Sequence, residues 1–219
     1  IDGSGLTGAF AQRFEANQSL ASFYMAEFTG FDSNGNPTYR DIDGNGIGDN
    51  NNDKFFVGED ALPDVTSGLN INFSHKNWIA SASFYGQFGF SVYNNTANAL
   101  FNAGQLANGG NVTRDVLNSG ENPSASADVS TRFLERGDFV RLQNTTIGYQ
   151  VPLADTKTFK SVLLSVTGQN LFLITGYSGL DPEVNTDGAN FLNGIPTAGI
   201  DYMAFPRPRI FTFSVIARF

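Results

Sequence analysis

The stretch Arg209-Ile210-Phe211-Thr212-Phe213-Ser214-Val215-Ile216-Ala217-Arg218-Phe219 alternates between apolar and polar residues over most of its length. Phe211, Phe213, Val215, Ala217 and Phe219 share one parity, while Ile210 and Ile216 break the polar parity. Because successive side chains of a strand point to opposite faces, the pattern predicts a strand between an apolar and a polar environment. A tilted strand needs ~9–11 residues to cross a bilayer, and this stretch is about that long. A soluble β-sandwich can also end on such a strand.

The same pattern recurs upstream and predicts an all-β chain. The clearest alternation runs from Trp78 to Phe90, with small and apolar residues on one parity and mostly polar residues on the other. Leu69, Ile71 and Phe73 alternate with polar residues in the same way. The expected strands are 20–31, 68–74, 78–90, 138–151, 161–175 and 209–219. The first of these has apolar residues on both parities, which leaves its orientation open.

The connections between these strands alternate in length. Short turns are expected at 75–77 and 153–157, and long polar loops at 32–60, 94–132 and 177–204. Short turns at one rim and long loops at the other are typical of an antiparallel, up-and-down transmembrane β-barrel. A sandwich would have shorter strands, with turns every ~8–12 residues. Trp78, Phe139 and Phe172 lie near strand ends, where interfacial aromatic girdles are expected.

Composition narrows the function classes. Among the 219 residues there is no cysteine, which excludes thiol chemistry and thiolate metal sites. Charged residues make up 16%, below the ~25% of ordinary soluble domains. The mean hydropathy of -0.17 and the lack of any ~18-residue apolar run predict no transmembrane helix. The net charge of -8 disfavours nucleic acid as a partner. Ile1 begins in mid-pattern without a signal peptide, so we expect the chain to be part of a longer protein.

Several stretches together resemble the C-terminal strands of TonB-dependent transporters of the SusC/RagA type. They are 139–149 (FVRLQNTTIGY) with Pro152, 168–172 (GQNLF), 177–183 (YSGLDPE), 204–209 (AFPRPR) before the terminal strand, and 39–46 (YRDIDGNG) running on to 56–58 (FVG). The resemblance extends in order from about Leu20 to the end of the chain.

The resemblance implies that residues 1–219 form the C-terminal portion of a larger, plugged barrel of roughly 22 strands, of which about six would lie here. The plug and the segment that contacts TonB would precede Ile1. It implies import of glycan oligomers or peptides across the outer membrane of a Gram-negative, Bacteroidetes-like bacterium, with a SusD-like lipoprotein as a lid. Tyr177, Asp181 and Glu183 would lie in loops that contact cargo or lid. Phe219 would signal to the barrel-assembly machinery, and the turns near His75 and Asp155 would be periplasmic.

A calcium site is the one metal site that the sequence suggests. Asp41, Asp43 and Asn45 occupy positions 1, 3 and 5 of a calcium loop, and Gly46 occupies position 6. Asp49 follows, but position 12 is Asn52 in place of a bidentate glutamate, and Asp53 comes one residue late. The candidate ligands are therefore Asp41, Asp43, Asn45, Asp49 and Asp53. The alternative is a solvated loop whose Asp and Asn residues favour tight turns.

No catalytic constellation is predicted. His75 is the only histidine, which argues against a histidine-based zinc site or a catalytic triad. Glu121, Glu135, Asp181 and Glu183 lie in or beside loops, and their spacing selects no pair for glycoside hydrolysis. The expectation is therefore a transporter and not an enzyme. Two alternatives remain open here, namely a soluble, calcium-stabilised β-sandwich that binds carbohydrate and a secreted glycoside hydrolase domain.

Overall fold

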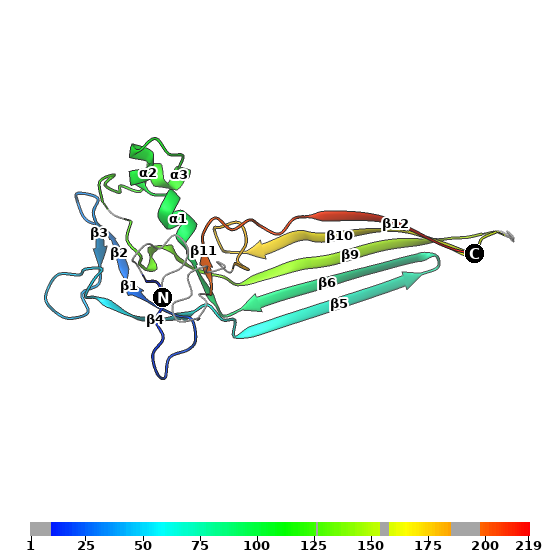
Figure 1. Cartoon of the computed structure of the whole chain (residues 1–219), viewed down its shortest axis with the longest axis horizontal. Coiled ribbons are helices and arrows are strands. Elements are labelled where there is room, and N and C mark those ends of the chain that lie inside the picture. Colours follow the sequence, from blue (N-terminus) through cyan, green and yellow to red (C-terminus); the bar gives the residue numbers. More distant parts are fainter. Residues whose placement is uncertain (1–9, 126, 154–157, 185–197) are drawn as a thin grey trace. The chain divides into compact units, whose positions relative to one another are not determined.

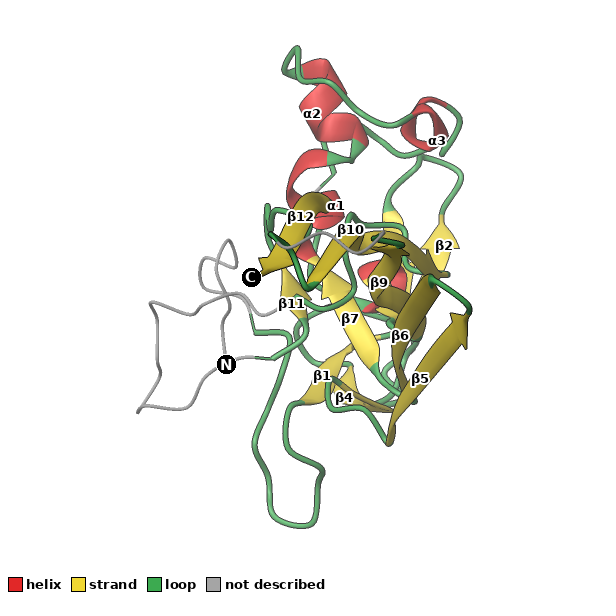
Figure 2. Ribbon diagram, turned by 90° about the vertical axis from the view of Figure 1, so that its right-hand side faces the viewer, coloured by secondary structure: helices red, strands yellow, loops and turns green. Residues whose placement is uncertain are grey.

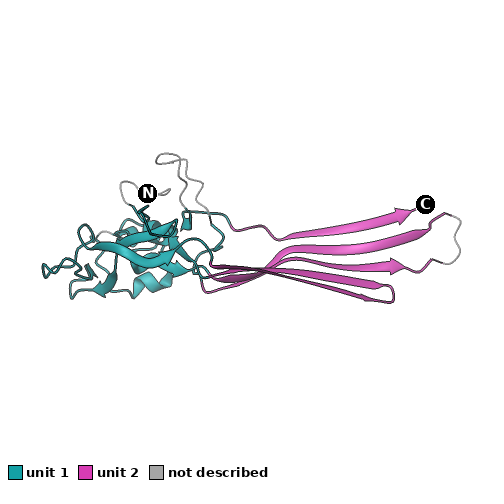
Figure 3. Cartoon of the chain, turned by 90° about the horizontal axis from the view of Figure 1, so that it is seen from below, with its two compact units in different colours: residues 1–63, 89–137, 177–205 teal, residues 64–88, 138–176, 206–219 magenta. Residues whose placement is uncertain are grey.

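A computed structural model describes residues 10–125, 127–153, 158–184 and 198–219. The chain divides into two compact units (Figure 3). Unit 1 comprises residues 1–63, 89–137 and 177–205, and unit 2 comprises residues 64–88, 138–176 and 206–219.

Unit 2 is one antiparallel sheet of five strands (Figure 1). Its order is β12-β10-β9-β6-β5. The bounds are β5 Val65–His75, β6 Trp78–Phe88, β9 Phe139–Val151, β10 Ser161–Thr175 and β12 Ile210–Arg218. The predicted strands 68–74, 78–90, 138–151, 161–175 and 209–219 are thus confirmed, and the sheet has five strands where about six were expected. The expected turn after His75 consists of Lys76 and Asn77. In the second short turn, residues 154–157 lie outside the described residues.

The register of this sheet brings the apolar residues together on one face. Val166 lies opposite Phe213 on one neighbouring strand and opposite Ile147 on the other, and Ile147 lies opposite Ala80. The large apolar side chains of this face are 41% to 79% exposed. They include Leu69, Ile71, Phe73, Trp78, Ile147, Leu164, Val166, Phe211, Phe213 and Val215. Within unit 2 the described strands form this single sheet, so no second sheet covers the face as a sandwich would require.

The opposite face carries rows of small polar side chains. Thr212, Thr167, Thr146 and Ser81 follow one another across the strands, and the hydroxyls of Thr146 and Thr167 lie 2.8 Å apart. Ile79 interrupts the polar pattern because Gly148, opposite it, leaves room for its side chain. A Cβ atom at Gly148 would lie only 2.7 Å from Cγ1 of Ile79.

An irregularity of the register lies across β9 and β10. The pairing shifts at Gln143 and at Asn170, and Asn170 adopts a positive φ of 54°. Its Oδ1 accepts a hydrogen bond of 2.6 Å from Arg141, and its Nδ2 donates one of 2.6 Å to the carbonyl of Arg207. β-Bulges of this kind redirect side chains. Asn170 thereby links β9 to the segment that precedes β12.

The predicted aromatic girdle is partly wrong. Trp78 and Phe172 lie on the exposed apolar face, and the ring of Trp78 is 4.7 Å from that of Tyr149. Phe139 is only 2% exposed and packs on the opposite face beside Tyr85. Because the register shift changes which parity faces the polar side, Phe139 cannot be placed by alternation alone.

Unit 1 consists of short strands and helices from the segment that precedes β5 and from the long connections between β6 and β9 and between β10 and β12 (Figure 2). The paired strands are β1 Ser22–Ala26 with β4 Lys54–Asp60, and β2 Phe28–Phe31 with β3 Pro37–Tyr39. A third sheet, β11-β7-β8, contains β7 Ser91–Asn94, β8 Leu134–Arg136 and β11 Ile200–Asp201. The helices are α1 Asn95–Leu100, α2 Ala103–Ala107, α3 Arg114–Leu117 and the 3₁₀ turn η1 Thr131–Phe133. Among the described residues, no helix is both long and apolar enough to cross a membrane.

Two expectations are corrected here. The stretch 20–31 is not one strand of the long sheet but the two short strands β1 and β2 of unit 1. Phe23 and Met25 are fully buried, and on the other parity Ala26 is fully buried and Tyr24 partly buried, which explains the apolar residues on both faces. The predicted loops 32–60, 94–132 and 177–204 are partly ordered, because β3, β4, the helices, η1 and β11 lie within them.

Candidate functional site

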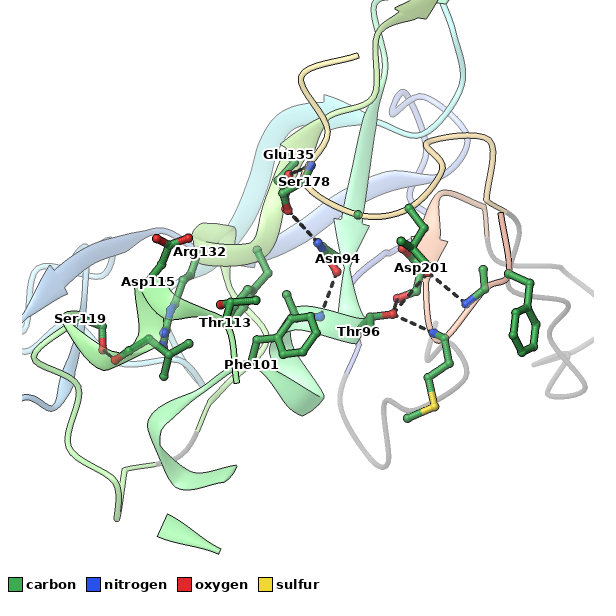
Figure 4. A pocket seen from close by; sticks show the side chains of 18 residues that line it. Asn94, Thr96, Phe101, Thr113, Asp115, Ser119, Arg132, Glu135, Ser178 and Asp201 are labelled. Atoms are coloured by element: carbon green, nitrogen blue, oxygen red, sulfur yellow. Dashed lines mark hydrogen bonds between the residues drawn. The ribbon is translucent and has the colours of Figure 1, made fainter. Parts of the chain in front are cut away.

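Unit 1 contains a cavity of about 570 Å³, a size typical of ligand pockets. Five stretches of the sequence, 94–101, 113–119, 132–135, 178–180 and 201–205, contribute to its lining (Figure 4). Its lining residues, here called the cavity lining, are Asn94, Thr96, Ala97, Phe101, Thr113, Asp115, Val116, Ser119, Arg132, Phe133, Glu135, Ser178, Gly179, Leu180, Asp201, Met203, Ala204 and Phe205.

A hydrogen-bond network around Glu135 joins three of these stretches. Its carboxylate accepts hydrogen bonds from the amide and the hydroxyl of Ser178, at 2.7 and 2.6 Å. Nδ2 of Asn94 donates to the same carboxylate at 3.0 Å, and the three side chains point toward one another in Figure 4. Oδ1 of Asn94 accepts from the amide of Ala97 and so caps helix α1. The network fixes the start of α1 against the segment at Ser178.

Asp201 organises a second corner of the cavity. The hydroxyl of Tyr177 donates a 2.7 Å hydrogen bond to its Oδ2, and both side chains are about 5% exposed or less. Burial raises the pKa of Tyr177 well above its usual value, and the hydrogen bond to Asp201 raises it further. Thr96 accepts a 2.7 Å hydrogen bond from the amide of Met203. These contacts hold the segment from Ile200 to Ala204 against α1.

Arg132 and Glu121 form a buried ion pair beside the cavity. Two hydrogen bonds of 2.7 and 2.9 Å join the guanidinium to both carboxylate oxygens, and the side chains are 15% and 2% exposed. The guanidinium also lies 4.7 to 5.6 Å from the ring centres of Phe28, Phe31 and Phe133. Burial alone would raise the pKa of Glu121, but the hydrogen bonds from Arg132 and the amide of Ala103 outweigh it and lower the pKa. The positive charge of Arg132 is thus already compensated.

The residues predicted to contact cargo, Tyr177, Asp181 and Glu183, are not part of the cavity lining. Tyr177 is bonded to Asp201, and Asp181 is 4% exposed and accepts a 3.0 Å hydrogen bond from the amide of Glu183. Between them, Ser178 and Leu180 do line the cavity. Cargo contact by Tyr177, Asp181 and Glu183 therefore stays a prediction, while the structure gives Tyr177 a role in positioning Asp201.

Three of the candidate calcium ligands lie close together. One carboxylate oxygen each of Asp41, Asp43 and Asp53 falls within 4.8 Å of the others. Asp53 is fully buried and accepts hydrogen bonds from the amides of Ile42, Asp43 and Asp49, at 2.7 to 3.1 Å. These bonds, led by that from Asp49, lower the pKa of Asp53.

The other two candidates serve neighbouring amides in the same loop. Asn45 accepts from the amide of Ile47, and Asp49 accepts from the amides of Asn51 and Asn52. The carboxylates thus stabilise the turns of the loop, as the alternative interpretation expected. Calcium binding remains a prediction. Phe219, the candidate assembly signal, is 74% exposed, and its ring lies 5.0 Å from that of Phe159.

The sequence alone did not point to the cavity. In the sequence, Glu121 and Glu135 are scattered carboxylates without a telling spacing, and the structure places them in two separate networks. Asn94, Thr96, Asp115 and most other members of the lining carry no periodic signal. The N-cap position of Asn94 before a short helix was the one local sign available.

Comparisons with known proteins identify the relatives of the chain. No family model matches it. TonB-dependent receptor P3 of Formosa agariphila is 29% identical over 97% of this chain and 24% of that protein. TonB-dependent receptor SusC of Bacteroides thetaiotaomicron is 30% identical over 95% of this chain and 20% of that protein. The chain therefore spans about a fifth to a quarter of the length of these curated relatives.

Solved structures agree in fold. A structure of the RagAB peptide transporter has a TM-score of 0.74 at 22% identity, covering 89% of this chain and 22% of that one. A structure of the RagAB peptide importer in an open-open state has a TM-score of 0.75 at 20% identity, covering 96% of this chain and 24% of that one. The predicted antiparallel fold, part of a larger barrel, is confirmed by these matches, and the relatives are named as receptors and transporters, not enzymes. Over nearly all of its length, the chain is a homologue of part of the TonB-dependent receptors of the SusC type.

Proposed function

We propose that the chain supplies barrel wall and surface loops to an active importer in the outer membrane of a Gram-negative, Bacteroidetes-like bacterium. Glycan oligomers or peptides would be its cargo, TonB would supply the energy through a part outside this chain, and a SusD-like lipoprotein would act as lid. The relatives support the first part of this proposal by their names, and the RagAB structures are described as a peptide transporter and importer.

The two-faced sheet of unit 2 is the observation that carries the proposal. One face exposes Trp78, Ile147, Phe213 and other large apolar side chains, and the other presents hydroxyl groups such as that of Thr146. In a transmembrane barrel the first face contacts lipid and the second faces the interior. The strands contain 9 to 15 residues, which is enough to cross the hydrocarbon layer at a tilt.

Topology supports a division of labour between the units. Beyond the hairpin turns, the long strands are joined only through segments of unit 1. If the short turns are periplasmic, unit 1 is the surface-exposed part, where loops meet cargo and lid. Cargo and lid contacts would then fall on unit 1, and lipid contacts on unit 2.

A soluble carbohydrate-binding sandwich is less well supported. Its core would need a second layer over the apolar face of unit 2, and the described strands of that unit supply none. A glycoside hydrolase domain is likewise less well supported, because Glu121 and Glu135 belong to two separate hydrogen-bond networks, one with Arg132 and one with Ser178.

Uptake by living cells tests the proposed function. A strain that lacks the parent gene would be compared with a strain that carries it, using a mixture of labelled oligosaccharides and peptides and measuring label retained inside the cells. We expect retention of at least one class to require both the gene and an intact TonB system. Equal retention in all strains would contradict the proposal.

A further inference from the structure

The two units differ strongly in charge. Unit 1 contains eighteen of the 21 acidic residues and six of the 13 basic ones, so its formal net charge is -12. Unit 2 holds the remaining three acidic and seven basic residues. A negative field of this size attracts cations and repels anions over roughly a Debye length, ~8 Å at physiological salt. Unit 1 is therefore expected to attract positively charged ligands and to repel negatively charged ones before they bind.

The cavity lies within this acidic unit and is mainly apolar. Phe101, Val116 and Phe133 contribute to its lining, as do Leu180 and Phe205. Leu180 is 69% exposed and Phe205 is 96% exposed. Apolar lining with a few convergent polar groups is the usual character of a ligand site.

The charged groups of the lining are unbalanced. Asp115, Glu135 and Asp201 contribute three carboxylates, against the single guanidinium of Arg132. Glu121, which is not part of the lining, already compensates that guanidinium through two hydrogen bonds. The carboxylate of exposed Asp115 has no hydrogen-bond or ion-pair partner among the described residues, so it is available to a ligand.

We propose that this cavity receives a positively charged peptide residue together with an apolar neighbour. An ammonium or guanidinium group would gain from the uncompensated carboxylates, whereas a carboxylate would be repelled. The aliphatic stem of a lysine or arginine can lie along apolar surface while its charged end reaches a carboxylate. A neutral sugar could donate hydrogen bonds to these carboxylates but would form no ion pair with them. The cavity is thus a site for basic, partly apolar peptide segments.

This inference rests on the proposed function for its biological setting, because the basic segment could belong to transported cargo or to a loop of the lipoprotein lid. The chemistry of recognition is the same in both cases. Addition of the lid protein to a binding assay separates the two sources. A lid segment that occupies the cavity would compete with a free peptide, whereas cargo binding would persist with the lid present.

The test uses the full-length receptor in detergent and isothermal titration calorimetry. The probe is the peptide Gly-Phe-Lys-Phe-Gly, acetylated at its N-terminus and amidated at its C-terminus, compared with versions that carry Gln or Glu in place of Lys. We expect the Lys peptide to bind at least tenfold more tightly than the Glu peptide, with the Gln peptide between them. Raising the salt concentration should weaken binding of the Lys peptide and leave binding of the Gln peptide nearly unchanged.

Asp115→Asn is the decisive variant, because this side chain is exposed and supports no described contact. The substitution should lower the affinity for the Lys peptide about fivefold and leave the affinity for the Gln peptide unchanged, as expected for one partly exposed charge pair. Glu15→Gln removes one negative charge from an exposed site of the same unit, outside the lining, and should change affinity less than twofold.

Equal affinities for the three peptides, or equal effects of Asp115→Asn and Glu15→Gln, would overturn the inference. Such a result would leave the proposed function standing if cells still required the gene for uptake. If uptake does not depend on the gene but the receptor still prefers the Lys peptide, the import function is contradicted and the proposed binding site still stands.

Discussion

Replacement of Arg132 by methionine should destabilise unit 1 selectively. Methionine keeps apolar bulk beside Phe28, Phe31 and Phe133 but leaves the carboxylate of Glu121, whose side chain is 2% exposed, without its charged partner. Breaking a buried ion pair from one side costs about 3–5 kcal/mol. We therefore expect the Arg132→Met variant to lose about 4 kcal/mol of local stability.

Hydrogen exchange followed by mass spectrometry measures this loss in the intact receptor. At 1.4 kcal/mol per decade, the amides of residues 103–133 should exchange about a thousandfold faster. Amides of β9 and β10 serve as the internal control and should not change. The double variant Arg132→Met, Glu121→Gln removes the unpaired buried carboxylate and should recover most of the protection of these amides against exchange.

The pH dependence gives the sign of the effect. The pKa of Glu121 is held below its ordinary 4.5 in the folded chain, so the stabilisation is present above pH 4.5 and is lost as the pH falls through the lowered value. The gap between the native chain and Arg132→Met should therefore shrink in acid. Exchange rates of Arg132→Met within threefold of the native rates, or a double variant as labile as the single one, would refute the reasoning.

Three further predictions concern the sheet, the acidic loop and the chain end. Ile147→Arg places a charge on the apolar face and should cost about 2–4 kcal/mol in the bilayer, whereas Thr146→Arg on the opposite face should assemble normally, as judged by the folded fraction on a gel. Asp53→Asn weakens the hydrogen bonds from three backbone amides and should make residues 41–53 susceptible to protease. If the native loop binds calcium, added calcium should protect it from cleavage. A cleavage pattern that changes neither with the substitution nor with calcium would exclude both effects. Deletion of Phe219 should lower the amount of assembled receptor in the membrane, and an undiminished amount would contradict its role as an assembly signal.

Much of unit 2 could be predicted from the sequence because alternate residues of a strand face opposite sides of the sheet, and here one side is apolar and the other polar. Trp78, Ala80 and Ala82 fall on the apolar face as their spacing indicates. The prediction fails at Phe139, beyond the register shift at Gln143, where the parity of the faces changes. Local bulges depend on contacts between strands, such as that between Arg141 and Asn170, and leave no periodic signal.

Unit 1 could not be predicted in the same way. Its helices have only four to six residues, too few for a 3.6-residue period to appear. The apolar residues of β1 occupy both parities because both sides of the strand are at least partly buried, so its sequence shows no alternation that would assign it to one sheet or the other. The cavity joins residues from Asn94 to Phe205 and is a property of the tertiary structure alone.

The central claim is that the two-faced sheet of unit 2 belongs to a barrel embedded in the outer membrane. Fractionation of cells that express the full-length parent, followed by electrophoresis with and without boiling, tests it most directly. We predict that the protein is recovered with outer membranes, needs detergent for release, and migrates differently before and after boiling. Recovery in the soluble fraction without detergent, with identical migration in both samples, would contradict the claim.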